Sequence, residues 1–224
     1  MSELQQNILY SAICIVVGYL CGCISTGYLV GRMKHVDIQK EGSGNLGATN
    51  ALRTTGISGG LITLAGDILK ALLPVLLVKY YFLKNLPGTE TGWFSTEFFV
   101  LLIGLATILG HNFPFWMHFK GGKGIASTGG ILLAFHLPMA GVLLAIFLVI
   151  AAITRYVSLA SLITVTCVPI AIGICYPGKW ALVIIGAAYT LLAFLRHRAN
   201  IVRLLQGTEN KLGQKKENSM EENR

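Results

Sequence analysis

Long hydrophobic runs make up most of the chain, and short polar segments separate them. The runs predict seven helices, at approximately 8–30, 57–80, 96–111, 124–136, 139–154, 157–176 and 180–196. Several of them approach the roughly 20 apolar residues that cross a bilayer. Short segments of alternating polarity, which a β-barrel would need, are absent from the sequence. We therefore expect an all-α polytopic membrane protein with seven transmembrane helices.

The fourth and fifth predicted helices meet at His136-Leu137-Pro138. Pro138 lacks a backbone N–H and discourages a continuous helix at this point. A single tilted helix over 124–154 is the alternative. The distribution of positive charge favours two helices, because an even number of spans would place the cationic clusters on opposite sides.

Composition and charge support this reading and set an orientation. Hydrophobic residues make up 54% of the chain and charged residues 12%, against about 25% charged in soluble domains. With the N-terminus outside, 14 of the 18 Lys and Arg residues fall on cytoplasmic segments, as the positive-inside rule requires. The C-terminus is then cytoplasmic. The net charge of +8 follows from this orientation and suits anionic membrane lipid, so we expect no nucleic-acid partner.

Residues 1–206 are expected to form a single membrane domain. The polar tail 207–224 is expected to be disordered at its end. All five cysteines fall inside apolar runs and have no metal-ligand spacing, so they are interpreted as packed membrane residues. No metal or cofactor is expected.

The first glycine-rich segment, 41–50, combines three glycines with hydroxyl and amide side chains, and Arg53 follows it. A dinucleotide fingerprint is rejected because no strand precedes the motif. Glycine allows backbone N–H groups to line a concave anion site. The candidate phosphate-binding residues of this segment are Ser43, Gly44, Asn45, Thr49, Asn50 and Arg53.

The second segment, Lys120-Gly121-Gly122-Lys123-Gly124, is not a Walker loop, because the spacing and the following residue differ. Lys123 stands at the start of a predicted helix, where unpaired N–H groups attract anions. We interpret Lys123, and with less support Lys120, as phosphate ligands. A basic loop that only sets topology is the alternative.

Other polar residues have two readings each. His197, Asn200 and Arg203 lie at helical spacing, which suits either a catalytic group or an amphipathic surface helix. Ser158 and Ser161 share a helix face and serve either helix packing or binding. Asp67 and Lys70 are expected to form a structural ion pair rather than to act in catalysis, and His111 to bond the last carbonyls of its helix rather than substrate.

The three polar segments together resemble the signature motifs of the bacterial acyl-phosphate:glycerol-3-phosphate acyltransferases. The resemblance rests on Ser43–Asn50, on Gly110–Pro114 with Phe119–Gly124, and on Asn200–Leu204 with Gly207–Glu209. Small departures occur at Ile24-Ser25-Thr26, Ala71 and Ser127. The resemblance implies a multi-pass enzyme of the bacterial inner membrane with its active site on the cytoplasmic face. It adds Glu209 to the binding residues.

The resemblance also implies a reaction. Acyl phosphate would acylate glycerol-3-phosphate to lysophosphatidic acid, and an acyl-phosphate-forming enzyme would be a functional partner. The sequence has no G-x-S-x-G elbow and no cysteine in a polar setting, so direct attack without an acyl-enzyme is expected. The candidate catalytic residues are Ser43, Lys123, His197 and Asn200. Either His197 or a substrate phosphate oxygen takes the proton. A transporter or channel for a phosphorylated metabolite is the rival hypothesis.

Overall fold

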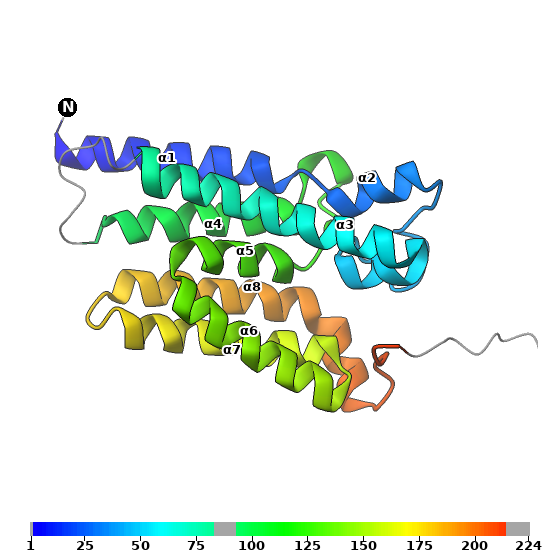
Figure 1. Ribbon diagram of the computed structural model, residues 1–224. Coiled ribbons are helices and arrows are strands. Elements are labelled where there is room, and N and C mark those ends of the chain that lie inside the picture. The colour runs from blue at the N-terminus through cyan, green and yellow to red at the C-terminus, as the bar shows by residue number, and fades with distance from the viewer. Residues whose placement is uncertain (1, 83–92, 214–224) are drawn as a thin grey trace, which may run out of the picture.

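The computed structural model describes residues 2–82 and 93–213, and within these ranges it contains helices and no strand. The helices run nearly parallel in one bundle (Figure 1). Their bounds are α1 Glu3–Gly22, α2 Thr26–Met33, α3 Ala48–Leu77, η1 Val78–Phe82, α4 Thr96–Asn112, η3 Phe115–Met117, α5 Ile125–Phe135, α6 Leu137–Thr154, α7 Val157–Cys175 and α8 Trp180–Leu205. The most extensive helix–helix contacts are those of α1 with α4, of α7 with α8, and of α3 with α5.

In the part of the chain that the structure describes, six segments are long and apolar enough to cross a membrane: 3–33, 48–80, 96–117, 137–154, 157–175 and 180–205. The apolar helix α5 has 11 residues, which rise only about 16 Å. The all-helical membrane fold is thus confirmed among the described residues. The count of seven crossings stays a prediction.

The break between the fourth and fifth predicted helices is confirmed. Helix α5 ends at Phe135 and α6 begins at Leu137, with His136 extended between them. The His136 side chain accepts a hydrogen bond from Met139 N and so caps α6. On the other side, Lys79 Nζ donates to the carbonyls of Ala134 and Phe135. These contacts satisfy the backbone groups that the break exposes.

The prediction of one continuous helix over 8–30 is wrong, because the chain unwinds between α1 and α2. Two carbonyls at the break accept hydrogen bonds from residues distant in sequence. Trp116 Nε1 donates to Cys23 O at 2.9 Å, and Lys70 Nζ donates to Ile24 O at 2.7 Å. Such partners make irregular backbone tolerable inside a membrane protein, and an apolar run gives no sign of them.

Two further boundaries differ from the predictions. Helix α3 begins at Ala48 rather than at 57, and it kinks at Gly56, whose φ of 81° is left-handed. Thr49, Asn50 and Arg53 therefore lie on a short helical segment rather than in a loop. Helix α8 continues to Leu205 instead of ending at 196. The prediction followed hydrophobic length, and the basic residues Arg196, Arg198 and Arg203 end the apolar run before the helix itself ends.

Helices α1 and α4 approach closely through glycine. A Cβ added at Gly18 would lie 2.5 Å from Ile103 O and 2.9 Å from Ala106 Cβ. Small residues permit such crossings in membrane proteins. The crossing holds α4, which ends beside the cavity described below.

Gly18→Ala should destabilise the protein by about 1–3 kcal/mol, because the added methyl group overpacks this crossing. Thermal unfolding in nanodiscs measures the effect. Gly141→Ala is the matched control, since a Cβ at Gly141 on α6 meets nothing within 4 Å and helical alanine is favoured over glycine. An equal loss of stability in both variants would contradict the close α1–α4 crossing.

Candidate active site

A cavity of about 330 Å³ opens among α3, α5, α6, α7 and α8. All but two of the predicted site residues line it, namely Ser43, Asn45, Thr49, Asn50, Arg53, Lys123, Ser158, Ser161, His197, Asn200, Arg203 and Glu209. The two residues that do not are Gly44 and Lys120. Most of the remaining wall is apolar, including Leu132, Leu143 and Phe147. The cavity thus joins a polar, cationic region to a hydrophobic one.

Asn50 holds the first glycine-rich segment in shape. Its Oδ1 accepts from Ser43 N at 2.8 Å, and its Nδ2 donates to Ile38 O and Glu41 O at 3.2 and 3.1 Å. Asn50 is almost fully buried. Its amide is therefore committed to the segment backbone, and Gly44, with a φ of 68°, supports the same turn. Ser43 and Arg53 remain the residues of this region best suited to contact an anion.

The second glycine-rich segment is fixed along both edges of its backbone. Gly121 N donates to Asn112 O and Gly122 N to His111 O. From the other side, Arg196 donates to the carbonyls of Gly121 and Gly122 at 2.9 and 3.0 Å. Arg196 was not among the predicted site residues. In the sequence Arg196 is marked by its place near two other basic residues, Arg198 and Arg203.

Lys123 extends from this segment into the cavity, where its Nζ donates to Asn200 Oδ1. Burial, reinforced by the positive charges of Arg203, Arg196 and Arg53, lowers its pKa to about 8 although Glu209 opposes the shift. Gly124 precedes α5 and provides no side-chain cap. Gly124, Ile125 and Ala126 line the same cavity, so the uncapped start of α5 adds to its attraction for anions. Lys120, by contrast, lies exposed, and only its carbonyl is engaged, by Gln39 Nε2.

Glu209 reaches into the cavity from the chain beyond α8. Its Oε1 accepts from Asn200 Nδ2 at 2.7 Å and from Ser158 Oγ at 2.8 Å, and its Oε2 accepts from Arg203 Nε at 2.7 Å. Burial alone would raise the pKa of this carboxyl, but the three donors and the Arg203 charge together lower it. Glu209 is thus an ionised junction among three predicted site residues.

We call residues 207–213 the C-terminal strap, because they turn back across the end of the bundle. Gly207 makes the turn with a φ of 70°. Farther along, Leu212 N donates to Arg155 O, and the Arg155 guanidinium donates twice to Leu212 O. The strap is therefore anchored to the α6–α7 connection. The disorder predicted for the end of the tail falls on residues 214–224, which lie outside the described residues.

His197 lies on α8 and is 2% exposed. Its Nδ1 lies 2.7 Å from Ala193 O. A carbonyl can only accept, so Nδ1 carries the hydrogen and Nε2 of the neutral ring keeps its lone pair. His197 is thus held in one tautomer at the cavity wall.

Ser161 lies on the neighbouring helix α7 and donates its hydroxyl to Val157 O in that helix.

Two residues interpreted as structural, Asp67 and His111, also line the cavity. Asp67 pairs with Lys70 at 2.9 Å, as expected. His111 does not bond the carbonyls at the end of its own helix; its Nδ1 contacts Lys70 Nζ at 2.7 Å. The prediction that the His111 side chain bonds the last carbonyls of its helix is therefore wrong, because its partner is Lys70.

Comparison with known proteins assigns the family. The profile of a family described as glycerol-3-phosphate acyltransferase matches residues 12–207. The chain belongs to the glycerol-3-phosphate acyltransferase family. This confirms the family assignment made from the three motifs and makes the protein an integral membrane acyltransferase.

Curated relatives of the acyltransferase match over nearly their whole length. The glycerol-3-phosphate acyltransferase of Clostridioides difficile (strain 630) is 43% identical over 207 residues, which cover 90% of this chain and 95% of the relative. That of Rhizobium meliloti (strain 1021) is 41% identical over 203 residues, covering 90% and 92%.

Two solved structures share the fold of the acyltransferase. Both are crystal structures of PlsY (YgiH), an integral membrane glycerol 3-phosphate acyltransferase. The glycerol 3-phosphate form has a TM-score of 0.79 at 33% identity, covering 91% of this chain and 96% of PlsY. The lysophosphatidic acid form has a TM-score of 0.77 at 32% identity, covering 91% and 95%.

Proposed function

We propose that this acyltransferase moves an acyl group from acyl phosphate to glycerol-3-phosphate, forming lysophosphatidic acid and inorganic phosphate. The observation that carries the proposal is the cavity, which joins the cationic groups of Arg53, Lys123 and Arg203 to apolar walls. Phosphate groups suit the first region, and an acyl chain suits the second. The related PlsY structures in glycerol 3-phosphate and lysophosphatidic acid forms support the same acceptor and product.

The reaction needs only one displacement. A glycerol hydroxyl oxygen attacks the carbonyl carbon of acyl phosphate, an ester C–O bond forms, and the bond from that carbon to the phosphate oxygen breaks. Inorganic phosphate leaves with the electron pair. The hydroxyl proton passes either to His197 Nε2 or to a phosphate oxygen of the donor. Ser43, Lys123 and Asn200 would position the reactants and balance negative charge.

An acyl-enzyme intermediate is not part of the proposal. No cysteine lines the cavity within the described residues. Ser161 donates its hydroxyl to Val157 O, which is not a base. Ser158 donates to Glu209, but the donors around this carboxylate lower its pKa and make it a weak base for activating a nucleophile. Acyl phosphate already carries a good leaving group, which makes direct attack sufficient.

We also propose seven crossings of a bacterial inner membrane, with the N-terminus outside and the cavity open to the cytoplasm. The basic residues Arg32, Arg53, Lys123 and Arg203 belong to segments at the end of the bundle where α2 and the last turns of α8 lie, opposite the N-terminus (Figure 1). This distribution follows the positive-inside rule. A cytoplasmic mouth would receive acyl phosphate from the enzyme that forms it.

The test is a reconstitution of the purified protein in lipid nanodiscs. Acyl phosphate should release inorganic phosphate only when glycerol-3-phosphate is present, and mass spectrometry should detect equimolar lysophosphatidic acid. Lys123→Met is the matched comparison and should form lysophosphatidic acid measurably but much more slowly. Uptake of glycerol-3-phosphate into proteoliposomes without product would overturn the proposal in favour of a transporter.

Binding of glycerol-3-phosphate should weaken as pH rises through about 8, because Lys123 loses its charge there. The substrate phosphate, with a second pKa of about 6, stays dianionic over this range. We expect the KM for glycerol-3-phosphate to rise about tenfold between pH 7 and 9.5. Steady-state kinetics at saturating acyl phosphate measures it.

Lys123→Arg is the control for this pH dependence, because a guanidinium stays charged throughout the range. Its KM should be higher at pH 7, since the geometry differs, but nearly independent of pH. An unchanged rise in KM in Lys123→Arg would assign the titration to another group.

A further inference from the structure

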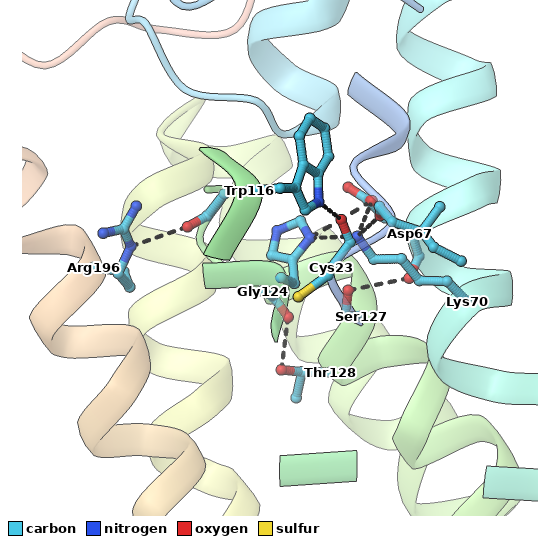
Figure 2. Close-up of polar contacts among 11 residues, drawn as sticks. Cys23, Asp67, Lys70, Trp116, Gly124, Ser127, Thr128 and Arg196 are labelled. Carbon is cyan, nitrogen blue, oxygen red and sulfur yellow. Dashed lines mark hydrogen bonds and ion pairs between the residues drawn. The ribbon is translucent and has the colours of Figure 1, made fainter. Parts of the chain in front are cut away.

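A buried charged cluster joins α3 to the end of α4, beside the cavity. Lys70 Nζ lies 2.9 Å from Asp67 Oδ1 and 2.7 Å from His111 Nδ1, and His111 Nδ1 lies 3.7 Å from Asp67 Oδ1. None of the three side chains is more than 6% exposed. Figure 2 shows Asp67 and Lys70 side by side next to Cys23 and Trp116.

A cluster of this kind is expensive to keep in a membrane protein, since each ion loses its hydration. Well-packed apolar residues of similar volume would fill the same space at lower cost. Part of its purpose is local, because Lys70 also donates to Ile24 O at the α1–α2 break. That contact needs only a cation, however, and accounts for neither the carboxylate of Asp67 nor the imidazole of His111.

The hydrogen-bond donors determine the state of His111. A lysine ammonium has no acceptor, so the short contact requires His111 Nδ1 to accept from Lys70. The ring hydrogen of neutral His111 then lies on Nε2, the edge turned away from the ion pair. The ion pair therefore fixes both the tautomer and the orientation of this ring, as outer partners do for functional histidines.

The Nε2 edge of His111 packs directly against Gly122. A Cβ added at Gly122 would overlap His111 Nε2 and Cε1. The backbone of the same residue binds the same glycine, because Gly122 N donates to His111 O at 3.0 Å. His111 thus contacts Gly122 with its ring and its carbonyl together.

Arg196 completes the fixation from the opposite side. Its Nε donates to Gly122 O, and Figure 2 shows its guanidinium facing the glycine segment from the side away from Asp67 and Lys70. Gly122 is therefore held between α4 and α8. The next residue is Lys123, which carries its ammonium into the cavity.

We propose that Asp67, Lys70 and His111 are positioning residues that act through Gly122 to hold the Lys123 ammonium in place for the phosphate of a substrate. The charged pair orients the His111 ring, the ring and its carbonyl fix Gly122, and the fixed backbone aims Lys123. Their contribution to acyl transfer rests on the proposed function. Their effect on the Gly121–Lys123 backbone does not, and it can be measured without turnover.

The first arm of the test is hydrogen exchange of full-length protein in nanodiscs. Asp67→Asn keeps the shape of the side chain but removes the charge. Amides of residues 119–124 should exchange about tenfold faster in this variant, whereas amides of residues 160–172, on helix α7, should be unchanged. Unchanged exchange at 119–124, or equal acceleration of both segments, would overturn the proposal.

Asp67→Asn leaves Lys70 as a lone buried cation, which is a risk to folding. The double variant Asp67→Asn with Lys70→Met removes both charges. His111→Ala removes the ring that packs against Gly122 and leaves the ion pair in place. If Asp67→Asn does not fold, these two variants enter the same comparison. Both should accelerate exchange at 119–124 selectively; wild-type exchange there in the two variants would overturn the proposal.

The second arm asks whether His111 acts through Lys123. His111→Ala should lower kcat/KM about tenfold or more in the wild-type background and in Thr49→Ala, which alters the other glycine-rich region. In Lys123→Met it should cost less than about twofold, because groups that act as a unit are not additive. Equal losses in all three backgrounds would indicate general destabilisation and overturn the positioning role.

The two arms separate this inference from the proposed function. A wild-type protein that forms no lysophosphatidic acid would contradict the function, and the exchange comparison would still decide whether the cluster fixes the Gly121–Lys123 backbone. An active enzyme with unaltered exchange in the variants would keep the function and remove the inference.

Discussion

Replacing His197 by alanine should lower kcat for acyl transfer by about 10²-fold or more, within the range of general acid–base catalysis. The structure holds His197 Nδ1 on Ala193 O, which leaves the basic Nε2 for the acceptor hydroxyl. Single-turnover kinetics with saturating substrates isolates the chemical step. His136→Asn, which keeps a side-chain cap on α6, is the matched control and should keep wild-type kcat.

A second substitution separates orientation from proton transfer. Asn at position 197 can still donate to Ala193 O but has no basic nitrogen. If His197 is the base, His197→Asn should be as slow as His197→Ala. A loss of only a few-fold in both variants would mean that a phosphate oxygen of the donor takes the proton, and that His197 is not required for the chemical step.

Removing the C-terminal strap should have a comparably large effect. A chain that stops after Gln206 lacks Glu209, so Ser158, Asn200 and Arg203 lose their common acceptor. Asn200 also holds Lys123, so the disturbance reaches the anion site. We expect kcat/KM to fall about 10²-fold or more, as when a buried charged junction loses its central partner.

A chain that stops after Gly213 is the control for this truncation. It keeps Glu209 and the contacts between Leu212 and Arg155, so it should retain wild-type kcat/KM. Steady-state kinetics of the two truncated chains, with thermal unfolding to verify folding, makes the comparison. Full activity in the shorter chain would show that Glu209 is dispensable.

The sequence predicted helices well where an apolar run ends at polar residues. The predicted 96–111 and 157–176 match α4, Thr96–Asn112, and α7, Val157–Cys175, within about one residue. Hydrophobic length is a strong signal in such segments. The α1–α2 break and the Gly56 kink escaped prediction because distant partners such as Trp116, or a single left-handed glycine, determine them.

The same contrast holds for the site. Ser43, Lys123 and His197, predicted to converge from separate segments, line one cavity. Lys120 was interpreted as a phosphate ligand with less support than Lys123, and the structure leaves it exposed. Arg196 was missed because its role is to bind backbone carbonyls, and the one-dimensional pattern does not distinguish that role from a basic surface position.

The α1–α2 break also has a consequence for biogenesis. Its carbonyls on Cys23 and Ile24 bond to Trp116 and Lys70, which follow them by 93 and 46 residues. A first span that enters the bilayer before these partners arrive would have to satisfy the two carbonyls locally, as an uninterrupted helix. It would then unwind once Lys70 and Trp116 lie beside it.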